Sequence, residues 1–336
     1  MKQQQLTEAE IMELTRKNIV YNFFDFTLIN DLYKKGHIEK TPVKYRGKLV
    51  LSIHSLMFSY DFLVDGYIKN NNLYEKYKEA MSGSGQSGYN KFAPIHSSSL
   101  FPFLIFSLVN KDNKLKIPSP QLKGVEFNDV IFEYKNKVFN SPSNIDVLLI
   151  GEKERKKVFL FLECKFSEYL STNRKVYSVK YKEAFDRYLP ENIRYNNINE
   201  GLQLVSDEPI YLDGIKQMIH HYIAISNFTN NIFYEANYNT QIASEYEVNS
   251  DNIDIFFGEM VFDFKKDFSN NKLENYQKNY SKLKDLLKDN KKITLLDNLL
   301  LYQDLFNYNG SAYFNKLDDV FKKLYEIDKQ IKNGGK

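Results

Sequence analysis

The sequence predicts an α/β protein whose central sheet is flanked by helical regions at both ends of the chain. Three apolar, strand-like segments follow one another closely between residues 128 and 166, with turn-forming residues between them. An amphipathic helix and a further strand-like segment come next, so the elements run helix, three strands, helix, strand. With 336 residues, the chain can bury a substantial core as one large domain or two smaller ones.

The N-terminal region, residues 1–90, is predicted to be mainly helical. Residues 7–34 have a helical pattern, and Thr7 followed by Glu10 is typical of a capping box at the start of a helix. The Gly/Ser-rich stretch 81–90 is predicted to be a loop that separates this region from the rest of the chain.

Residues 91–265 are predicted to form the core of the fold. A short buried helix is expected at 97–109, where a serine can cap the start and Pro102 is tolerated in the first turn. The residues GEKERK favour a turn between the second and third strands, so these two strands are expected to pair as an antiparallel hairpin. The expected strands are 128–139, 144–151, 156–166 and 252–264.

A polar stretch, 167–210, separates the hairpin from a short amphipathic helix at 213–225. From residue 270 onward, Lys, Leu and Asp recur as in amphipathic helices. The C-terminal region, 266–336, is therefore predicted to be helical. We expect both terminal regions to pack with the core as one unit.

Composition and charge favour a soluble protein of a reducing compartment. The sequence is 43% hydrophobic and 26% charged, and its one cysteine cannot form an internal disulfide. The first residues lack the apolar core of a signal peptide, and no apolar run is long enough to span a bilayer. We therefore expect a cytoplasmic protein without a membrane partner. The net charge of +3 is too small to indicate nucleic-acid binding by itself.

Two charged residues interrupt the apolar strand VFLFLECKF, residues 158–166. Glu163 and Lys165 are two positions apart, so their side chains point to the same side of a strand. Burying charges is unfavourable unless they are paired, bind a metal or take part in chemistry. Asp146 lies on the preceding strand, and a tight hairpin brings it to the same end of the sheet. A structural ion pair is the alternative explanation.

Two neighbouring carboxylates repel each other, and a divalent cation relieves that repulsion. Oxygen ligands from Asp146 and Glu163, together with a backbone carbonyl and waters, suit Mg²⁺ or Mn²⁺. Such a cation can lower the pKa of a bound water and neutralise charge that grows on a phosphate. Lys165 can orient the attacking water or stabilise the developing anion. The three residues therefore indicate the hydrolysis of a phosphate ester.

Asp146, followed by Glu163-Cys164-Lys165 on the next strand, resembles the motif of the PD-(D/E)XK nuclease superfamily, which has the restriction-endonuclease-like fold. The order of segments across the predicted core matches that family's αβββαβ arrangement, which has a mixed central sheet. The resemblance implies that Asp146 and Glu163 bind the metal. It also implies that Cys164 offers its backbone carbonyl to the metal and that Lys165 assists the nucleophilic water.

The resemblance suggests two further site residues. Many family members place a polar residue, often Gln, on the helix after the hairpin, and Gln217 is the counterpart here, with His221 on the same helical edge. A solvent-facing side chain explains Gln217 equally well. Family members also often provide an upstream acidic group, for which Glu133 on the first strand is the nearest candidate metal ligand. A surface glutamate on a strand is the commoner case.

The chain contains a second set of residues with a similar pattern, Asp254 followed by Asp263 and Lys265. Nine residues separate the two aspartates, which leaves too little room for two full strands and a turn. The order of segments around this set also differs from the family's. We therefore assign the site to the first set, although Ile145 stands where many family members have a proline.

A nuclease must hold a polyanion, and a basic, Tyr-rich stretch after the hairpin is the candidate surface. Lysine and arginine pair with phosphates, and tyrosine stacks on exposed bases. A solvated helix face explains such a stretch as well. Ser98 is a further candidate phosphate contact, with helix capping as the alternative. The candidate basic positions are Arg174, Lys175, Lys180 and Lys182.

Together, the residues and the resemblance predict a metal-dependent endonuclease that hydrolyses nucleic acid, with double-stranded DNA as the favoured substrate. A restriction or other defence enzyme is the favoured subtype, and a homodimer would suit the cutting of two strands. Two alternatives stay open. One is a module that has the nuclease fold and binds nucleic acid without cutting it, and the other is a hydrolase of a different phosphate ester.

Overall fold

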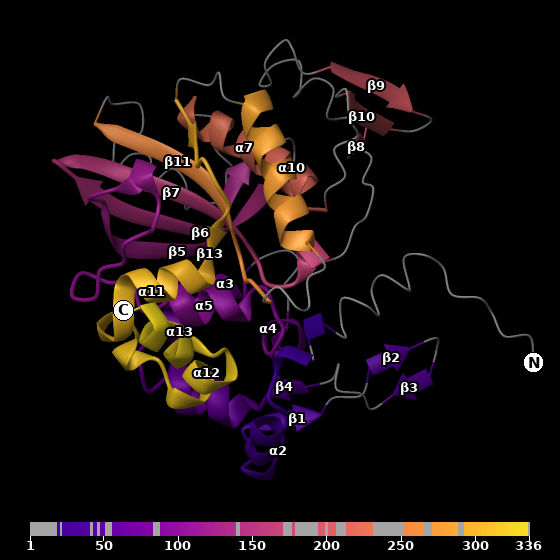
Figure 1. Cartoon of the computed structure of the whole chain (residues 1–336), viewed down its shortest axis with the longest axis vertical. Helices are drawn as coiled ribbons and strands as arrows, with labels where there is room; N and C mark the ends of the chain where they lie inside the picture. The colour runs from indigo at the N-terminus through magenta and orange to yellow at the C-terminus, as the bar shows by residue number, and fades with distance from the viewer. Residues whose placement is uncertain are drawn as a thin grey trace, which may run out of the picture.

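The structure is a computed structural model of the chain, and its central feature is a mixed, six-stranded β-sheet (Figure 1). Five strands lie in the order β12-β11-β7-β6-β5, and β13 also pairs with β11. The α/β class and the mixed sheet predicted from the sequence are confirmed. The structure describes residues 19–20, 22–40, 43–45, 48–50, 56–82, 88–138, 142–170, 177–178, 194–198, 201–205, 213–230, 252–264, 271–287 and 292–334.

Antiparallel and parallel ladders meet in the middle of the sheet. β5 pairs with β6 and β6 with β7 in antiparallel ladders, whereas β11 is parallel to β7 and to the two short strands β12 and β13. All four predicted strands and the predicted hairpin are therefore present. The strand bounds are β5 Glu126–Lys137, β6 Pro142–Lys153, β7 Lys156–Lys165, β11 Ile253–Val261, β12 Thr294–Leu295 and β13 Leu300–Leu301.

The β6–β7 hairpin turns through two residues in the left-handed backbone region. Glu154 has a φ of 50° and Arg155 a φ of 71°, the sign that a two-residue turn needs to match the twist of its strands. Further along β6, Gly151 lies so close to β5 that a Cβ atom there would be 2.7 Å from the Glu126 carbonyl oxygen. The absence of a side chain at Gly151 therefore allows β5 and β6 to pair closely.

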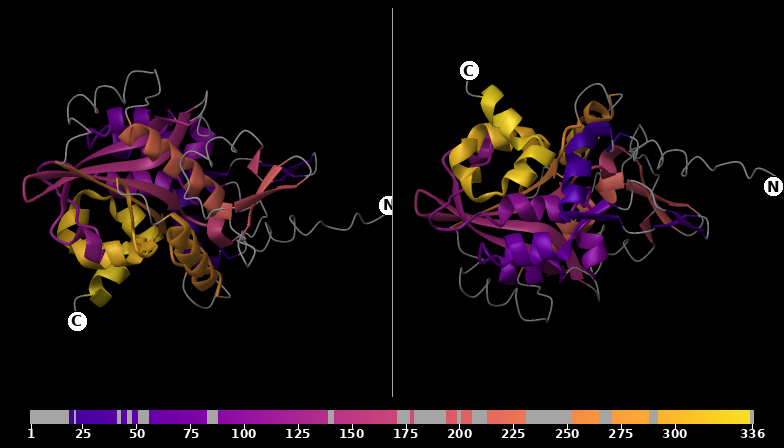
Figure 2. Two further views of the ribbon diagram at one scale, coloured as in Figure 1. Left: turned by 90° about the horizontal axis from the view of Figure 1, so that it is seen from above. Right: turned by 90° about the horizontal axis from the view of Figure 1, so that it is seen from below.

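Side chains of β7 alternate between two helical layers, which explains why this strand is apolar on both faces. On one face, Phe161 contacts Phe228 of α7. On the other, Phe166, the first residue after β7, contacts Phe101 of α5, which in turn contacts Tyr302 of α11. Figure 2 shows α7 and the C-terminal helices on opposite sides of the sheet. The three helices are α7 Asp213–Thr229, α5 Leu100–Phe106 and α11 Tyr302–Tyr313.

The N-terminal region contains short strands in addition to helices. The helix predicted over 7–34 is interrupted, because α2 begins at Phe26 after its own cap, Asp25, whose Oδ1 accepts from the Thr27 N–H at 2.8 Å. The predicted capping box and part of the predicted Gly/Ser loop lie outside the described residues. The elements are α2 Phe26–Lys34, β1 Ile38–Lys40, β2 Val43–Tyr45, β3 Lys48–Val50, β4 Leu56–Phe58, the π-helix η2 Asp61–Ile68, α3 Tyr74–Ala80 and α4 Tyr89–Phe92.

The C-terminal helices pack against residues from the N-terminal region. The ring of Phe321 lies 5.1 Å from that of Phe58, and the Tyr325 hydroxyl donates to the carbonyl oxygen of Ile95, just beyond that region, at 2.8 Å. Both ends of the chain thus contribute to one continuous hydrophobic core. Beyond α11 and the two short strands before it, this region contains α10 Lys272–Leu287, η5 Phe314–Lys316, α12 Asp319–Leu324 and α13 Ile327–Gly334.

A small antiparallel sheet of order β8-β10-β9 lies within the predicted polar stretch 167–210, between β7 and α7. Within the described ranges, no helix combines the length and hydrophobicity needed to cross a membrane. The remaining elements are η3 Pro120–Leu122, η4 Glu168–Leu170, β8 Tyr177–Ser178, β9 Arg194–Ile198 and β10 Gly201–Val205.

Candidate active site

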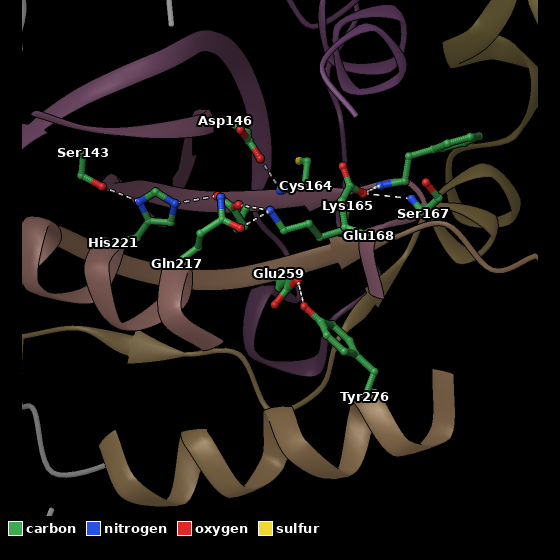
Figure 3. Close-up of polar contacts among 12 residues, drawn as sticks. Ser143, Asp146, Cys164, Lys165, Ser167, Glu168, Gln217, His221, Glu259 and Tyr276 are labelled. Carbon is green, nitrogen blue, oxygen red and sulfur yellow. Dashed lines mark hydrogen bonds and ion pairs between the residues drawn. The ribbon is translucent and has the colours of Figure 1, made fainter. Parts of the chain in front are cut away.

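Strands β6 and β7 stop pairing where the candidate site begins. Val147 and Leu162 are the last pair of their ladder, and Asp146 and Glu163 come directly after it. In place of a strand–strand bond, Asp146 Oδ2 accepts a hydrogen bond from the backbone N–H of Cys164 at 2.7 Å (Figure 3). Residues that face each other across an antiparallel ladder point to the same side, so Asp146 and Glu163 share one face of the sheet.

Glu163 and Lys165 form a buried ion pair on that face. The Lys165 amine donates to Glu163 Oε1, and the two residues are 6% and 1% exposed, respectively. Charged side chains are almost never buried to this extent unless they are paired. The pairing therefore explains how an apolar strand accommodates two charges, and the sequence-based prediction that they project together is confirmed.

Helix α7 supplies two polar side chains to this pair. Gln217 Oε1 accepts a hydrogen bond from the Lys165 amine at 3.0 Å. One helical turn later, His221 Nε2 lies 2.7 Å from Glu163 Oε2, and His221 Nδ1 lies 2.6 Å from the hydroxyl oxygen of Ser143. The predicted common edge of Gln217 and His221 is confirmed, since both contact the same ion pair.

Burial and pairing give the two carboxylates different pKa values. Burial raises the pKa of Asp146 well above its usual value, and repulsion from Glu163 raises it further. Burial also acts to raise the pKa of Glu163, but the charges of Lys165 and His221 outweigh it and lower this pKa to about 2. Burial alone lowers the pKa of Lys165, whereas Glu163 and Asp146 raise it above its usual value. Glu163 and Lys165 are therefore both charged, and negative charge on Asp146 is poorly compensated.

Glu133 lies beside Asp146 at an irregular point of β5. The residues on either side of Glu133 pair with the two neighbours of Asp146, which places Glu133 level with Asp146 across the ladder. Its φ of 49° is rare for a residue other than glycine and is typical of strained backbone at functional sites. Burial, followed by repulsion from Glu163, raises its pKa to about 7. Its predicted role as a metal ligand stays a prediction.

The donor chemistry of this site suits a hard divalent cation. Asp146 and Glu163 supply adjacent carboxylates, of which Asp146 is partly exposed and Glu163 is 1% exposed, so an ion would reach the site from the side of Asp146. Burial, followed by repulsion from Glu163, raises the pKa of Asp146, and a cation beside it would favour its charged form. Among the described residues, no three His, Cys, Asp or Glu side chains form a group that could hold an ion. A cation here would therefore also need backbone and water oxygens, among which the Cys164 carbonyl stays a prediction.

The structure separates the second set of residues that resembles the motif. Asp254 lies near the start of β11 and pairs with Lys156 at a distance of 3.5 Å, whereas Asp263 follows the other end of that strand. The two aspartates are thus too far apart to share a cation. Lys265 lies outside the described residues.

Of the predicted phosphate contacts, only Ser98 lies among the described residues, and the structure gives it no evident role as a helix cap. Ser98 is half-buried near the start of α5, but the hydroxyl that accepts from backbone N–H groups there belongs to Ser97, which bonds Ser99 and Leu100. The four candidate basic positions lie outside the described residues; they are Arg174, Lys175, Lys180 and Lys182.

Sequence reasoning missed three buried polar residues around the site. Ser143 contacts His221, and Glu259 is the neighbour of Glu163 in the β7–β11 ladder, where it accepts a hydrogen bond from the Tyr276 hydroxyl. Burial raises the pKa of Glu259 to about 8. A lone glutamate in an apolar strand is the signal that could have identified Glu259, by the argument already made for Glu163. The sequence contains no comparable signal for Ser143.

No relative supplies a function for this arrangement. Comparisons with protein-family models, with curated proteins and with solved structures each found no match. The functional argument therefore depends on the geometry of the site and on the chemistry of its side chains.

Proposed function

We propose that this protein is a metal-dependent nuclease of the PD-(D/E)XK type. The observation that supports the proposal most is the convergence of Asp146, Glu163 and Lys165 at the point where β6 and β7 separate. The element order α5, β5, β6, β7, α7, β11 agrees with the αβββαβ order expected for that family. The contact between Lys165 and Gln217 adds the helix residue that the family resemblance implies.

Each side chain has a defined part in this proposal. A cation bound here would lower the pKa of a water molecule and neutralise charge on a phosphate. The protonated amine of Lys165, held by Glu163 and Gln217, would stabilise negative charge that develops on the phosphate oxygens. The candidate ligands for Mg²⁺ or Mn²⁺ are Asp146, Glu163, the backbone carbonyl of Cys164 and Glu133.

Double-stranded DNA is the proposed substrate, and a restriction or other defence endonuclease is the proposed subtype. This step depends on family analogy, because fold and site chemistry do not by themselves define a target. A homodimer would place two sites on the two strands of a duplex. The basic positions in the stretch after β7 are the proposed phosphate contacts.

One observation favours a second candidate, a module that binds nucleic acid without cutting it. Both oxygens of Glu163 already have partners, Lys165 on one side and His221 on the other. This is also the arrangement of a buried ion pair that serves only the fold. The two candidates differ in one measurable property, the requirement for a cation.

The deciding experiment is cleavage of supercoiled plasmid, single-stranded DNA and RNA in Mg²⁺, Mn²⁺ or EDTA. Wild type is compared with Asp146→Asn and Lys165→Met, with folding of each variant checked by circular dichroism. Lys156→Ala is the matched control, because Lys156 lies on the same strand but pairs with Asp254 at its other end. We expect cutting in Mg²⁺ or Mn²⁺ only, at least 100-fold slower in both site variants and unchanged in the control.

Three results would contradict the proposal. Cleavage that survives both folded site variants would mean that other carboxylates carry the reaction. Binding of DNA that is equal in EDTA and Mg²⁺, without cutting of any substrate, would favour the binding module. Turnover of a small phosphodiester alone would instead assign the site to a different phosphate ester.

A further inference from the structure

We propose that His221, held by Ser143, is a positioning residue that fixes the Glu163 carboxylate for cation binding. The inference depends on the proposed function, since it concerns the same site. Its basis is a chain of contacts that begins at Ser143 on β6, passes through His221 on α7 to Glu163 and Lys165 on β7, and returns to α7 at Gln217. Gln217 is exposed, and the other four members are buried.

His221 uses both of its ring nitrogens. Nε2 lies 2.7 Å from Glu163 Oε2, which is within ion-pair distance but without the alignment of a hydrogen bond. The other ring nitrogen, Nδ1, lies 2.6 Å from the Ser143 hydroxyl, which can either donate or accept. Ser143 therefore satisfies the distal nitrogen of His221 and holds the ring in the orientation that faces Glu163.

The chain contains the residue types of a Ser-His-acid triad, but burial excludes the hydroxyl as a nucleophile. Ser143 is 1% exposed and His221 is 4% exposed, so a substrate carbonyl or phosphate cannot reach the Ser143 oxygen. The contacts can therefore act only inward, on Glu163. They fix the orientation of its carboxylate from the side opposite to Lys165.

This orientation matters because Glu163 lies beyond the last β6–β7 pair. Strand β6 makes no ladder contact with Glu163. The pairing of β7 with β11 fixes the backbone of Glu163 but not its side chain. His221 supplies the missing constraint from a helix. Residues that orient a metal-binding side chain typically change metal affinity by 10- to 100-fold when they are removed.

The test is Mn²⁺ affinity, measured by isothermal titration calorimetry on wild type and four variants without nucleic acid. His221→Ala removes the contact with Glu163, His221→Gln keeps a donor of similar reach, and Ser143→Ala removes only the support of the ring. His220→Ala changes the neighbouring histidine of the same helix and is the matched control. Thermal unfolding of each variant without metal separates folding from binding.

We expect His221→Ala to weaken Mn²⁺ binding by 10- to 100-fold, with His221→Gln recovering part of the loss and Ser143→Ala losing less. His220→Ala should bind like wild type. A purely structural role would lower the unfolding temperature of His221→Ala but leave the Mn²⁺ affinity of the folded protein unchanged, and this result would overturn the inference alone. Tighter binding by His221→Ala would also overturn it, because His221 would then compete with the cation.

The same titration separates this inference from the proposed function. Failure of wild type to bind Mn²⁺ or Mg²⁺ in any condition would overturn both. Wild-type binding that is equal in His221→Ala would leave the proposed nuclease intact and remove only the role of His221. Plasmid cleavage by the same set of variants should follow the order of their Mn²⁺ affinities.

Discussion

Two glutamates lie side by side in the β7–β11 ladder, and they differ in their charge. Glu163 and Glu259 are directly paired in register and are 1% and 2% exposed, respectively. Glu163 contacts an amine and an imidazole, which lower its pKa to about 2. Glu259 contacts the hydroxyl of Tyr276, and burial raises its pKa to about 8. At neutral pH the first is ionised and the second is mostly protonated.

The difference shows that burial alone does not decide the charge of a carboxylate in this core. The two side chains have nearly the same exposure, so the desolvation that opposes ionisation acts on both. Among the described residues, a cation lies within bonding distance of Glu163 but not of Glu259. The pairing with Lys165 thus maintains a negative charge at the end of β7, where the proposed function requires one, whereas the neighbouring Glu259 is mostly protonated.

The largest expected effect comes from removing the cation that distinguishes the two glutamates. Lys165→Met leaves Glu163 buried and without its amine partner, while the apolar stem of the side chain is retained. Breaking a buried pair in this way costs about 3–5 kcal/mol of unfolding free energy. Urea denaturation at pH 7 measures the loss. An unchanged unfolding midpoint would mean that water, rather than Lys165, stabilises the charge on Glu163.

The next effect is a change in how stability depends on pH. The pKa of Glu259 is higher in the folded chain, about 8, than its ordinary value of 4.5, so the folded state retains a proton that the unfolded state releases. Stability from Glu259 is therefore complete at low pH and is lost as pH rises through this interval. Between pH 6 and 7.5 the loss is about 2 kcal/mol.

Glu259→Gln should remove that loss, because glutamine is uncharged at every pH and can still accept from Tyr276. Urea denaturation at pH 6 and 7.5 measures how far the unfolding free energy of wild type and of the variant changes with pH. An equal change in both proteins would show that Glu259 is already ionised at pH 6. The comparison with Glu163 would then fail, since both glutamates would carry a charge.

The sequence analysis identified Glu163 and its partner Lys165 but overlooked Glu259. Two charges in the apolar strand VFLFLECKF were enough to predict Glu163 and Lys165, and the length of the hairpin predicted their meeting with Asp146. These predictions succeeded because strand alternation and turn length are local properties of the chain. The helix after the hairpin was located for the same reason, since an apolar stripe at helical spacing marked it.

The contacts that the sequence did not predict join elements distant in the chain. Ser143 and His221 are 78 residues apart, and Tyr276 reaches Glu259 from a helix 17 residues further on. No local pattern specifies which face of α7 or α10 meets which strand, because packing of the whole core decides it. The strained backbone of Glu133 likewise depends on tertiary contacts and has no signature in the sequence.

A smaller effect is expected at the tyrosine that partners Glu259. Tyr276→Phe removes the hydroxyl and leaves the Glu259 carboxyl without its donor, at a cost of about 1 kcal/mol. The hydrogen bond from Tyr276 lowers the pKa of Glu259, so its loss should raise that pKa and extend the pH dependence to higher pH. Urea denaturation at pH 6 and 8.5 tests both effects. If the variant has the unfolding free energy of wild type and the same change with pH, the Tyr276 hydroxyl makes no net contribution to stability.

The smallest effect is expected at an exposed ion pair on the same helix as Tyr276. Lys278 and Glu274 lie one turn apart on α10, with their charged atoms 2.8 Å apart, and both side chains are more than 60% exposed. Water and salt screen such a pair, so Lys278→Ala should leave the unfolding free energy and DNA cleavage within error of wild type. Like Lys165 and Glu163, these two residues form a lysine–glutamate pair within ion-pair distance, but the pair on α10 is exposed and the pair on β7 is buried. A large loss at Lys278 would therefore show that distance between charges, rather than burial, controls ion-pair strength in this protein.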